Sequence, residues 1–80
     1  MPYRIYTRVN YAETWRDADD IHIDHLGFKQ DLDAAMDVAN DYIKNHFVHK
    51  DTKLAKHGKD YTATDFISFG KTVVVERLSE

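Results

Sequence analysis

The sequence predicts an α+β protein in which one long helix packs on a mainly antiparallel sheet of three to four strands. Two observations indicate this fold class. The segment Asp31–His49 has a helical period, with apolar residues on one face and charged residues on the other. Shorter segments on both sides of it alternate between apolar and polar residues, as half-buried strands do. The element order is β(β)αββ, and residues 1–80 are the size of a single small domain.

Two strands are predicted before the helix. Tyr3–Val9 alternates β-branched and aromatic residues with arginines, and Asp20–Asp24 alternates isoleucines with polar residues. We expect these two segments to pair, with Gly27 and Phe28 turning the chain into the helix. Residues 10–20 between them fit either an irregular connection with one or two helical turns or the open end of a long hairpin.

The helix has a clear start signal and a clear buried face. Asp31 is a good N-cap because its carboxylate can accept a hydrogen bond from a first-turn amide. The period also places His46 on the buried face. The apolar residues of that face are Leu32, Ala35, Met36, Ala39, Tyr42, Ile43 and Phe47.

After the helix, residues 49–60 are polar and rich in lysine, which predicts a surface loop around Gly58. The segments Tyr61–Phe69 and Thr72–Leu78 predict a closing hairpin. Glycine at position 70 suits a type II′ turn between these two strands.

The last strand raises a packing problem. Val73, Val74 and Val75 are consecutive, so both faces of this strand are apolar, yet one helix covers only one face of a sheet. The other face needs cover from the 10–20 connection with Trp15 or from a second chain. We therefore predict partner contacts at Trp15, Val73 and Val75. We also predict a symmetric homodimer that forms through the uncovered sheet face or through the edge of the C-terminal strand.

The composition excludes several classes of function. There is no cysteine, which excludes disulfides, thiol nucleophiles and cysteine-ligated zinc. The three glycines are isolated, so no phosphate-binding loop or nucleophile elbow is present. We expect no cofactor and no enzymatic activity. No run of eighteen apolar residues occurs. We expect no signal peptide, a cytoplasmic location and no membrane binding.

The charges are segregated along the chain despite a net charge of only −3. Eight aspartates face one lysine between residues 17 and 41, and Asp33, Asp37 and Asp41 recur at i, i+4 on the predicted helix. This pattern fits either a solvated face or a surface for a basic partner. We predict a small acidic, cysteine-free protein-interaction module, accessory or inhibitory, that acts through this helix face or an exposed sheet face.

A direct ligand binder is the alternative function. Nucleic acid could contact four evenly spaced lysines, although the acidic total argues against it; these are Lys50, Lys53, Lys56 and Lys59. A divalent metal could use close histidine and aspartate pairs, at His22, Asp24, His46 and His49. We predict no metal site, because tetrahedral sites need three or four converging ligands.

Overall fold

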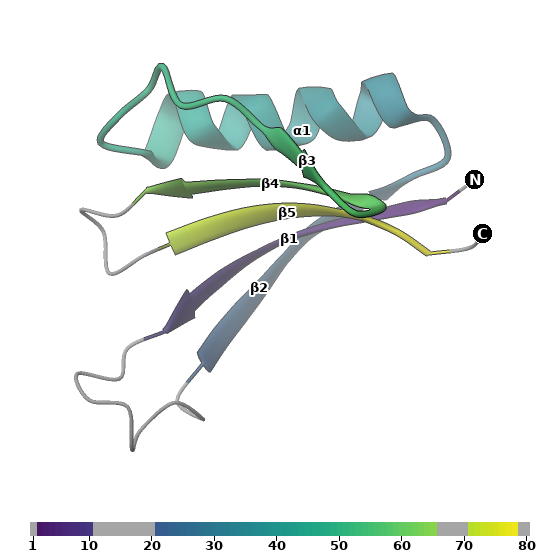
Figure 1. Ribbon diagram of the computed structural model, residues 1–80, viewed down its shortest axis with the longest axis horizontal. Coiled ribbons are helices and arrows are strands. Elements are labelled where there is room, and N and C mark those ends of the chain that lie inside the picture. Colours follow the sequence, from purple (N-terminus) through teal and green to yellow (C-terminus); the bar gives the residue numbers. More distant parts are fainter. Residues whose placement is uncertain (1, 11–20, 66–70, 79–80) are drawn as a thin grey trace.

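The computed structural model describes residues 2–10, 21–65 and 71–78. In chain order the elements are β1 (Tyr3–Asn10), β2 (Ile21–Lys29), α1 (Leu32–His46), β3 (Ala55–His57), β4 (Asp60–Asp65) and β5 (Lys71–Arg77). The strands form one antiparallel sheet in the order β2-β1-β5-β4-β3. Helix α1 lies along one face of this sheet (Figure 1). The predicted α+β class is confirmed, and the sheet has one strand more than the upper end of the prediction.

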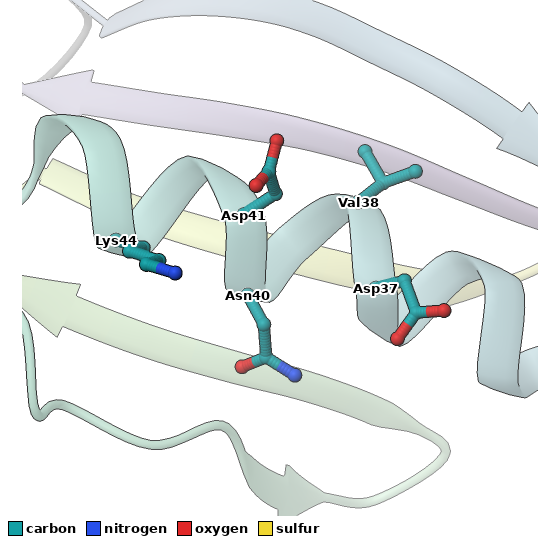
Figure 2. Close-up of a pocket in the computed structure, with 5 residues that line it drawn as sticks. All are labelled: Asp37, Val38, Asn40, Asp41 and Lys44. Atoms are coloured by element: carbon teal, nitrogen blue, oxygen red, sulfur yellow. The ribbon is translucent and has the colours of Figure 1, made fainter.

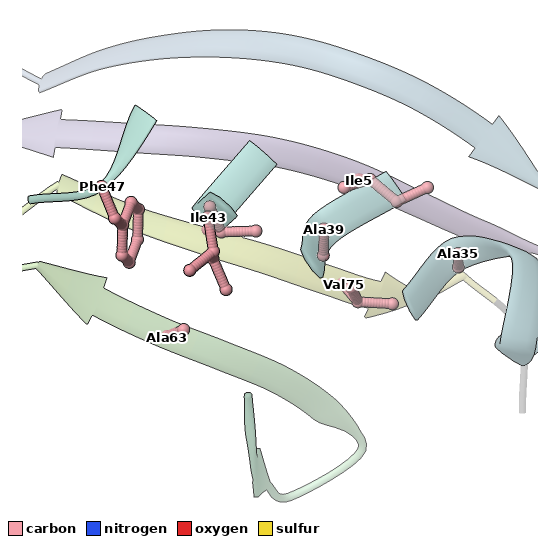
Figure 3. Close-up of a cluster of buried hydrophobic side chains, with 8 residues drawn as sticks. Ile5, Ala35, Ala39, Ile43, Phe47, Ala63 and Val75 are labelled. Carbon is pink, nitrogen blue, oxygen red and sulfur yellow. The ribbon is translucent and has the colours of Figure 1, made fainter. Parts of the chain in front are cut away.

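Helix α1 packs on the sheet through the predicted face. The carboxylate of Asp31 is the N-cap and accepts a hydrogen bond from the Ala34 amide at 3.4 Å. Buried residues then recur at every fourth position and meet strand residues in one hydrophobic core (Figure 3). The core consists of Ile5, Ala35, Ala39, Ile43, Phe47, Ala63, Val73 and Val75.

The helix ends at His46, three residues before the predicted end at His49. Phe47 is already extended, with φ −76° and ψ 146°. The next amide, that of Val48, donates a hydrogen bond of 2.7 Å to the buried carboxylate of Asp65 on β4. This tertiary contact fixes the chain to the sheet where helical periodicity alone would continue the helix.

Two segments predicted outside strands belong to strands. Gly27 and Phe28 lie within β2 rather than in a turn, and β3 lies within the predicted loop at residues 49–60. All three residues of β3 are exposed, so this strand has no alternating pattern that the sequence could show. Gly58 does lie at a turn, between β3 and β4, with φ +64°.

Strand β2 contains a β-bulge opposite β1. Ile5 pairs with Gly27 and Tyr6 pairs with His25, so Leu26 is an extra residue in the ladder. The extra residue changes the alternation of side chains. A residue before Leu26 and a residue after it therefore share a face where a regular strand would place them on opposite faces, and the reverse also holds.

The consecutive valines of β5 divide between the two faces. Val73 and Val75 lie under α1 with 0% exposure, and Val74 lies on the opposite face with 3% exposure. In the ladder Val74 stands between Tyr6 of β1 and Thr62 of β4. All three valines of the run are therefore buried, although no described element packs over the face on which Val74 lies. Because β5 lies between β1 and β4, it has no free edge through which a dimer could form. The hairpin partners Phe66, Ile67 and Phe69 and the turn predicted at Gly70 lie outside the described residues.

No helix within the described ranges has the length and apolar character needed to cross a membrane.

Candidate functional site

The outer side of α1 carries three exposed aspartates at four-residue intervals, Asp33, Asp37 and Asp41, which we call the acidic ridge. None of the three forms an ion pair with another described residue. Like charges at this spacing repel each other on a helix. The ridge is therefore a line of negative charge, and Lys44 is the cation that lines the same depression as Asp37 and Asp41.

A groove runs beside the acidic ridge, between α1 and the edge strand β2. Its volume is about 190 Å³. The residues that line this α1–β2 groove are Leu26, Val38, Asp41, Tyr42, Asn45 and His46. Figure 2 shows that Val38 and Asp41 point to the same side of the helix. One wall of the groove is therefore apolar, and its rim carries a carboxylate.

A second, more open depression lies on the outer surface of α1, lined by Asp37, Val38, Asn40, Asp41 and Lys44 (Figure 2). It shares Val38 and Asp41 with the α1–β2 groove. The α1–β2 groove therefore continues into the acidic ridge as one surface. The spacing of the sequence indicates the aspartates but not that Leu26 lies beside them, because this approach depends on where β2 lies relative to α1.

His46 is exposed rather than buried, and its ring stacks on Tyr42 with 4.5 Å between centroids. The buried residues follow the row Ala35, Ala39, Ile43. Each step of four residues turns this row by roughly 40° around an α-helix. In the last turn, the side of the helix that faces the sheet is therefore no longer the side that carries His46. The prediction that His46 is buried is wrong because it assumed that the same side of the helix faces the sheet along its whole length.

The sheet face away from α1, which we call the open face, is not covered by any described element. Its exposed apolar side chains lie on β2, where Ile23 is 59% and Phe28 is 57% exposed. The rings of His25 and Phe28 are 5.5 Å apart. Strict alternation would separate these two residues, and the bulge at Leu26 brings both to the open face.

Polar and aromatic side chains, rather than exposed apolar ones, lie at the centre of the open face. The Arg4 guanidinium lies 4.7 Å above the Tyr6 ring, and its Nε donates a hydrogen bond of 2.9 Å to Glu76. Val74 is the apolar residue beneath this part of the face. The exposed apolar area is therefore at the β2 edge.

The prediction of partner contacts at Val73 and Val75 is wrong in the folded chain. Both side chains are completely buried under α1, where no partner can reach them. The sequence could not distinguish which valines of the run would face the helix. Trp15, the third predicted contact of this set, lies outside the described residues.

The evenly spaced lysines do not form one strip. Lys50 Nζ donates hydrogen bonds to the carbonyls of Lys44 and Phe47, at 2.9 and 3.3 Å, and so caps the end of α1. Lys53 is exposed in the connection that follows. Lys56 and Lys59 instead belong to the β3–β4 hairpin, where they line a different cavity; its residues are Tyr3, Lys56, Gly58, Lys59, Tyr61 and Arg77.

The histidine and aspartate pairs do not converge within the described residues. No group of three or more metal-ligating side chains occurs there. Asp24 pairs with buried Thr7 in the ladder, and His49 Nδ1 lies 3.8 Å from the carboxylate of Asp65. His46 is instead stacked on Tyr42. The side chain of His22 lies outside the described part.

No protein-family model matches the sequence, and neither the comparison with curated proteins nor that with solved structures finds a significant match.

Proposed function

We propose that this protein is an interaction module that binds a basic segment of another protein through the acidic ridge and the α1–β2 groove. The observation that carries this proposal is that the α1–β2 groove and the open depression on the outer surface of α1 share Val38 and Asp41. The function is one of binding rather than catalysis.

The chemistry of this surface suits long basic side chains. Lysine and arginine have an aliphatic stem that packs on apolar surface and a charged head that remains near the rim. Leu26 and Val38 supply apolar surface for the stem, and Asp41 supplies the carboxylate for the head. Asp37 lies one helical turn before Asp41 and would receive a second cation.

Electrostatic attraction over the ridge would also speed association with a basic partner. Complementary charge raises association rates at low salt and loses this effect as salt is added. We therefore expect binding that weakens clearly with ionic strength. The apolar part of the groove should leave a residual affinity that salt does not remove.

The test is an NMR titration of the ¹⁵N-labelled protein with two peptides of equal charge. One alternates arginine with leucine, and the other alternates arginine with glycine. The Arg–Leu peptide should give saturable shifts at Val38, Asp41 and Leu26 and bind more tightly than the Arg–Gly peptide. Asp41→Asn and Leu26→Ala should each weaken this binding.

Asp51→Asn is the matched control, because Asp51 is an exposed aspartate outside the ridge and groove. Equal weakening by Asp51→Asn and Asp41→Asn would show a dependence on net charge alone and would contradict the proposal. So would equal affinity for the two peptides. A native lysate can then supply the physiological partner, captured by the parent protein and lost with Asp37→Asn/Asp41→Asn.

A further inference from the structure

A cavity of about 250 Å³ lies on the α1 side of the sheet, where β1 begins and β5 ends, and the β3–β4 turn borders it. One water molecule occupies about 30 Å³ in the liquid, so the cavity holds a group several times larger. Lys56, Lys59 and Arg77 give it three cationic side chains, and Tyr3 and Tyr61 give it two phenols. None of its described lining residues is acidic.

The strand register brings these residues together from four strands. Tyr3 pairs directly with Arg77, and Lys56 pairs directly with Tyr61, so each pair shares one face of the sheet. Tyr3 and Tyr61 both pack against the hydrophobic core under α1, which identifies that face. Gly58, at φ +64°, forms the tight turn that precedes Lys59.

Arg77, which lines this cavity, has an unsatisfied donor. Its Nε is buried and has no hydrogen-bond partner among the described residues. A buried donor without an acceptor is destabilising, so this position favours the arrival of an anion. Asp60 is not the missing acceptor. Its carboxylate accepts a hydrogen bond of 3.4 Å from the backbone amide of Arg77, and Asp60 does not line the cavity.

We propose that this cavity binds the phosphate group of a small phosphorylated molecule. A guanidinium presents a planar fork that matches phosphate oxygens, and lysine ammonium groups add point charges. A phosphate monoester carries about −1.5 to −2 charges at pH 7, which suits three nearby cations better than a single carboxylate does. The phenols of Tyr3 and Tyr61 can donate further hydrogen bonds to its oxygens.

The test is an NMR titration of the intact protein with inorganic phosphate and with a nucleoside monophosphate, at constant ionic strength maintained with chloride. Both should give saturable shifts at the amides of Gly58, Lys59 and Tyr61 and at the Nε–Hε signal of Arg77. Tighter binding of the nucleotide would assign a nucleotide as the source of the phosphate. Equal binding would assign recognition of the phosphate group alone.

Lys56→Gln and Arg77→Lys should each weaken phosphate binding at least about tenfold, the loss of one charge-assisted hydrogen bond. Lys53→Gln is the matched control, since it removes the same charge outside the cavity. A dispersed spectrum would confirm that each variant is folded. Equal weakening by Lys53→Gln, or shifts that chloride alone reproduces, would overturn the proposal, as would shifts that do not saturate.

Discussion

Asp65 links two parts of the fold that are separated in sequence. Its side chain is buried at the end of β4, and its carboxylate accepts the amide of Val48 just beyond α1. The carboxylate thus supports the path that the chain takes after the helix. Nothing in the local sequence indicates this role, because the two residues are 17 positions apart.

We predict that Asp65→Ala lowers the free energy of unfolding by about 1–3 kcal/mol, the cost of leaving a buried donor unsatisfied. Asp51→Ala, an exposed aspartate in the same connection as Val48, should change it by less than about 0.5 kcal/mol. Urea denaturation of both variants measures the difference. Equal stability of the two variants would mean that the Val48 amide finds another acceptor.

Two glycines should respond to alanine in opposite ways. At Gly58 a side chain meets open space but must adopt φ +64°, which costs about 1–2 kcal/mol. Gly27 also faces open space and has no positive φ, so alanine should be tolerated or stabilise by about 0.4–1 kcal/mol. Thermal unfolding of Gly58→Ala and Gly27→Ala distinguishes them. A loss of stability in both would show that space rather than backbone conformation limits Gly27.

Helix α1 shows what a sequence pattern predicts well about an element. Its N-cap and the apolar residues of its buried face follow from spacing alone, because a cap and a buried stripe are local properties. Its C-terminus does not follow, since the contact to Asp65 sets it. The place of His46 does not follow either, because the buried direction turns along the helix.

Strand β3 shows the opposite case. Its residues Ala55–His57 are all exposed, so burial imposes no alternation on them, and the surrounding lysines give the segment the composition of a loop. The sequence pattern does not indicate the cavity bordered by this strand either, because the cavity depends on long-range pairing between Tyr3 and Arg77. The acidic ridge, by contrast, lies on one element and was predicted from its spacing.

The acidic ridge should cost the helix stability. Two repulsive i, i+4 pairs destabilise by roughly 0.2–0.5 kcal/mol each. Replacing Asp33, Asp37 and Asp41 together with asparagine should therefore leave stability equal or raise it by up to about 1 kcal/mol. Urea denaturation at low salt measures this change. A clear loss of stability would show that the ridge stabilises the fold and would remove the energetic argument for its role in binding.

At the scale of the whole molecule, helix α1 covers one face of the sheet, and the described elements leave the open face uncovered (Figure 1). Ile23 and Phe28 expose apolar surface there, at an edge strand of nine residues. Long edge strands with exposed apolar residues favour pairing with another chain. The other edge strand, β3, has only three residues, and short edge strands pair poorly with another chain. We therefore expect β2 to be the edge that pairs with another chain.

We predict that the protein forms a symmetric dimer through β2 and the open face. Sedimentation at increasing protein concentration should show a monomer–dimer equilibrium, and Ile23→Thr/Phe28→Thr should shift it toward the monomer. Val48→Thr is a suitable control, because Val48 is equally exposed but lies beyond α1. A monomer at every concentration would contradict this prediction.

We also predict that folding does not require a metal. The described histidine and aspartate side chains do not gather into a group of three ligands. Adding a chelator should therefore leave the melting temperature unchanged in a thermal scan. A large decrease would indicate a bound ion that stabilises the native state.

The extra residue in β2 has a consequence for how this chain tolerates changes in length. Leu26 is unpaired in the ladder, so its deletion would leave Ile5 opposite Gly27 and Tyr6 opposite His25, as they are now. Such a deletion would keep every other residue of the strand on its present face. It would remove the apolar side chain that β2 contributes to the α1–β2 groove and to the packing against the core. A homologue shorter by one residue here would therefore keep the strand register and the acidic ridge and yet lack the contact that Leu26 offers to the aliphatic part of a bound side chain.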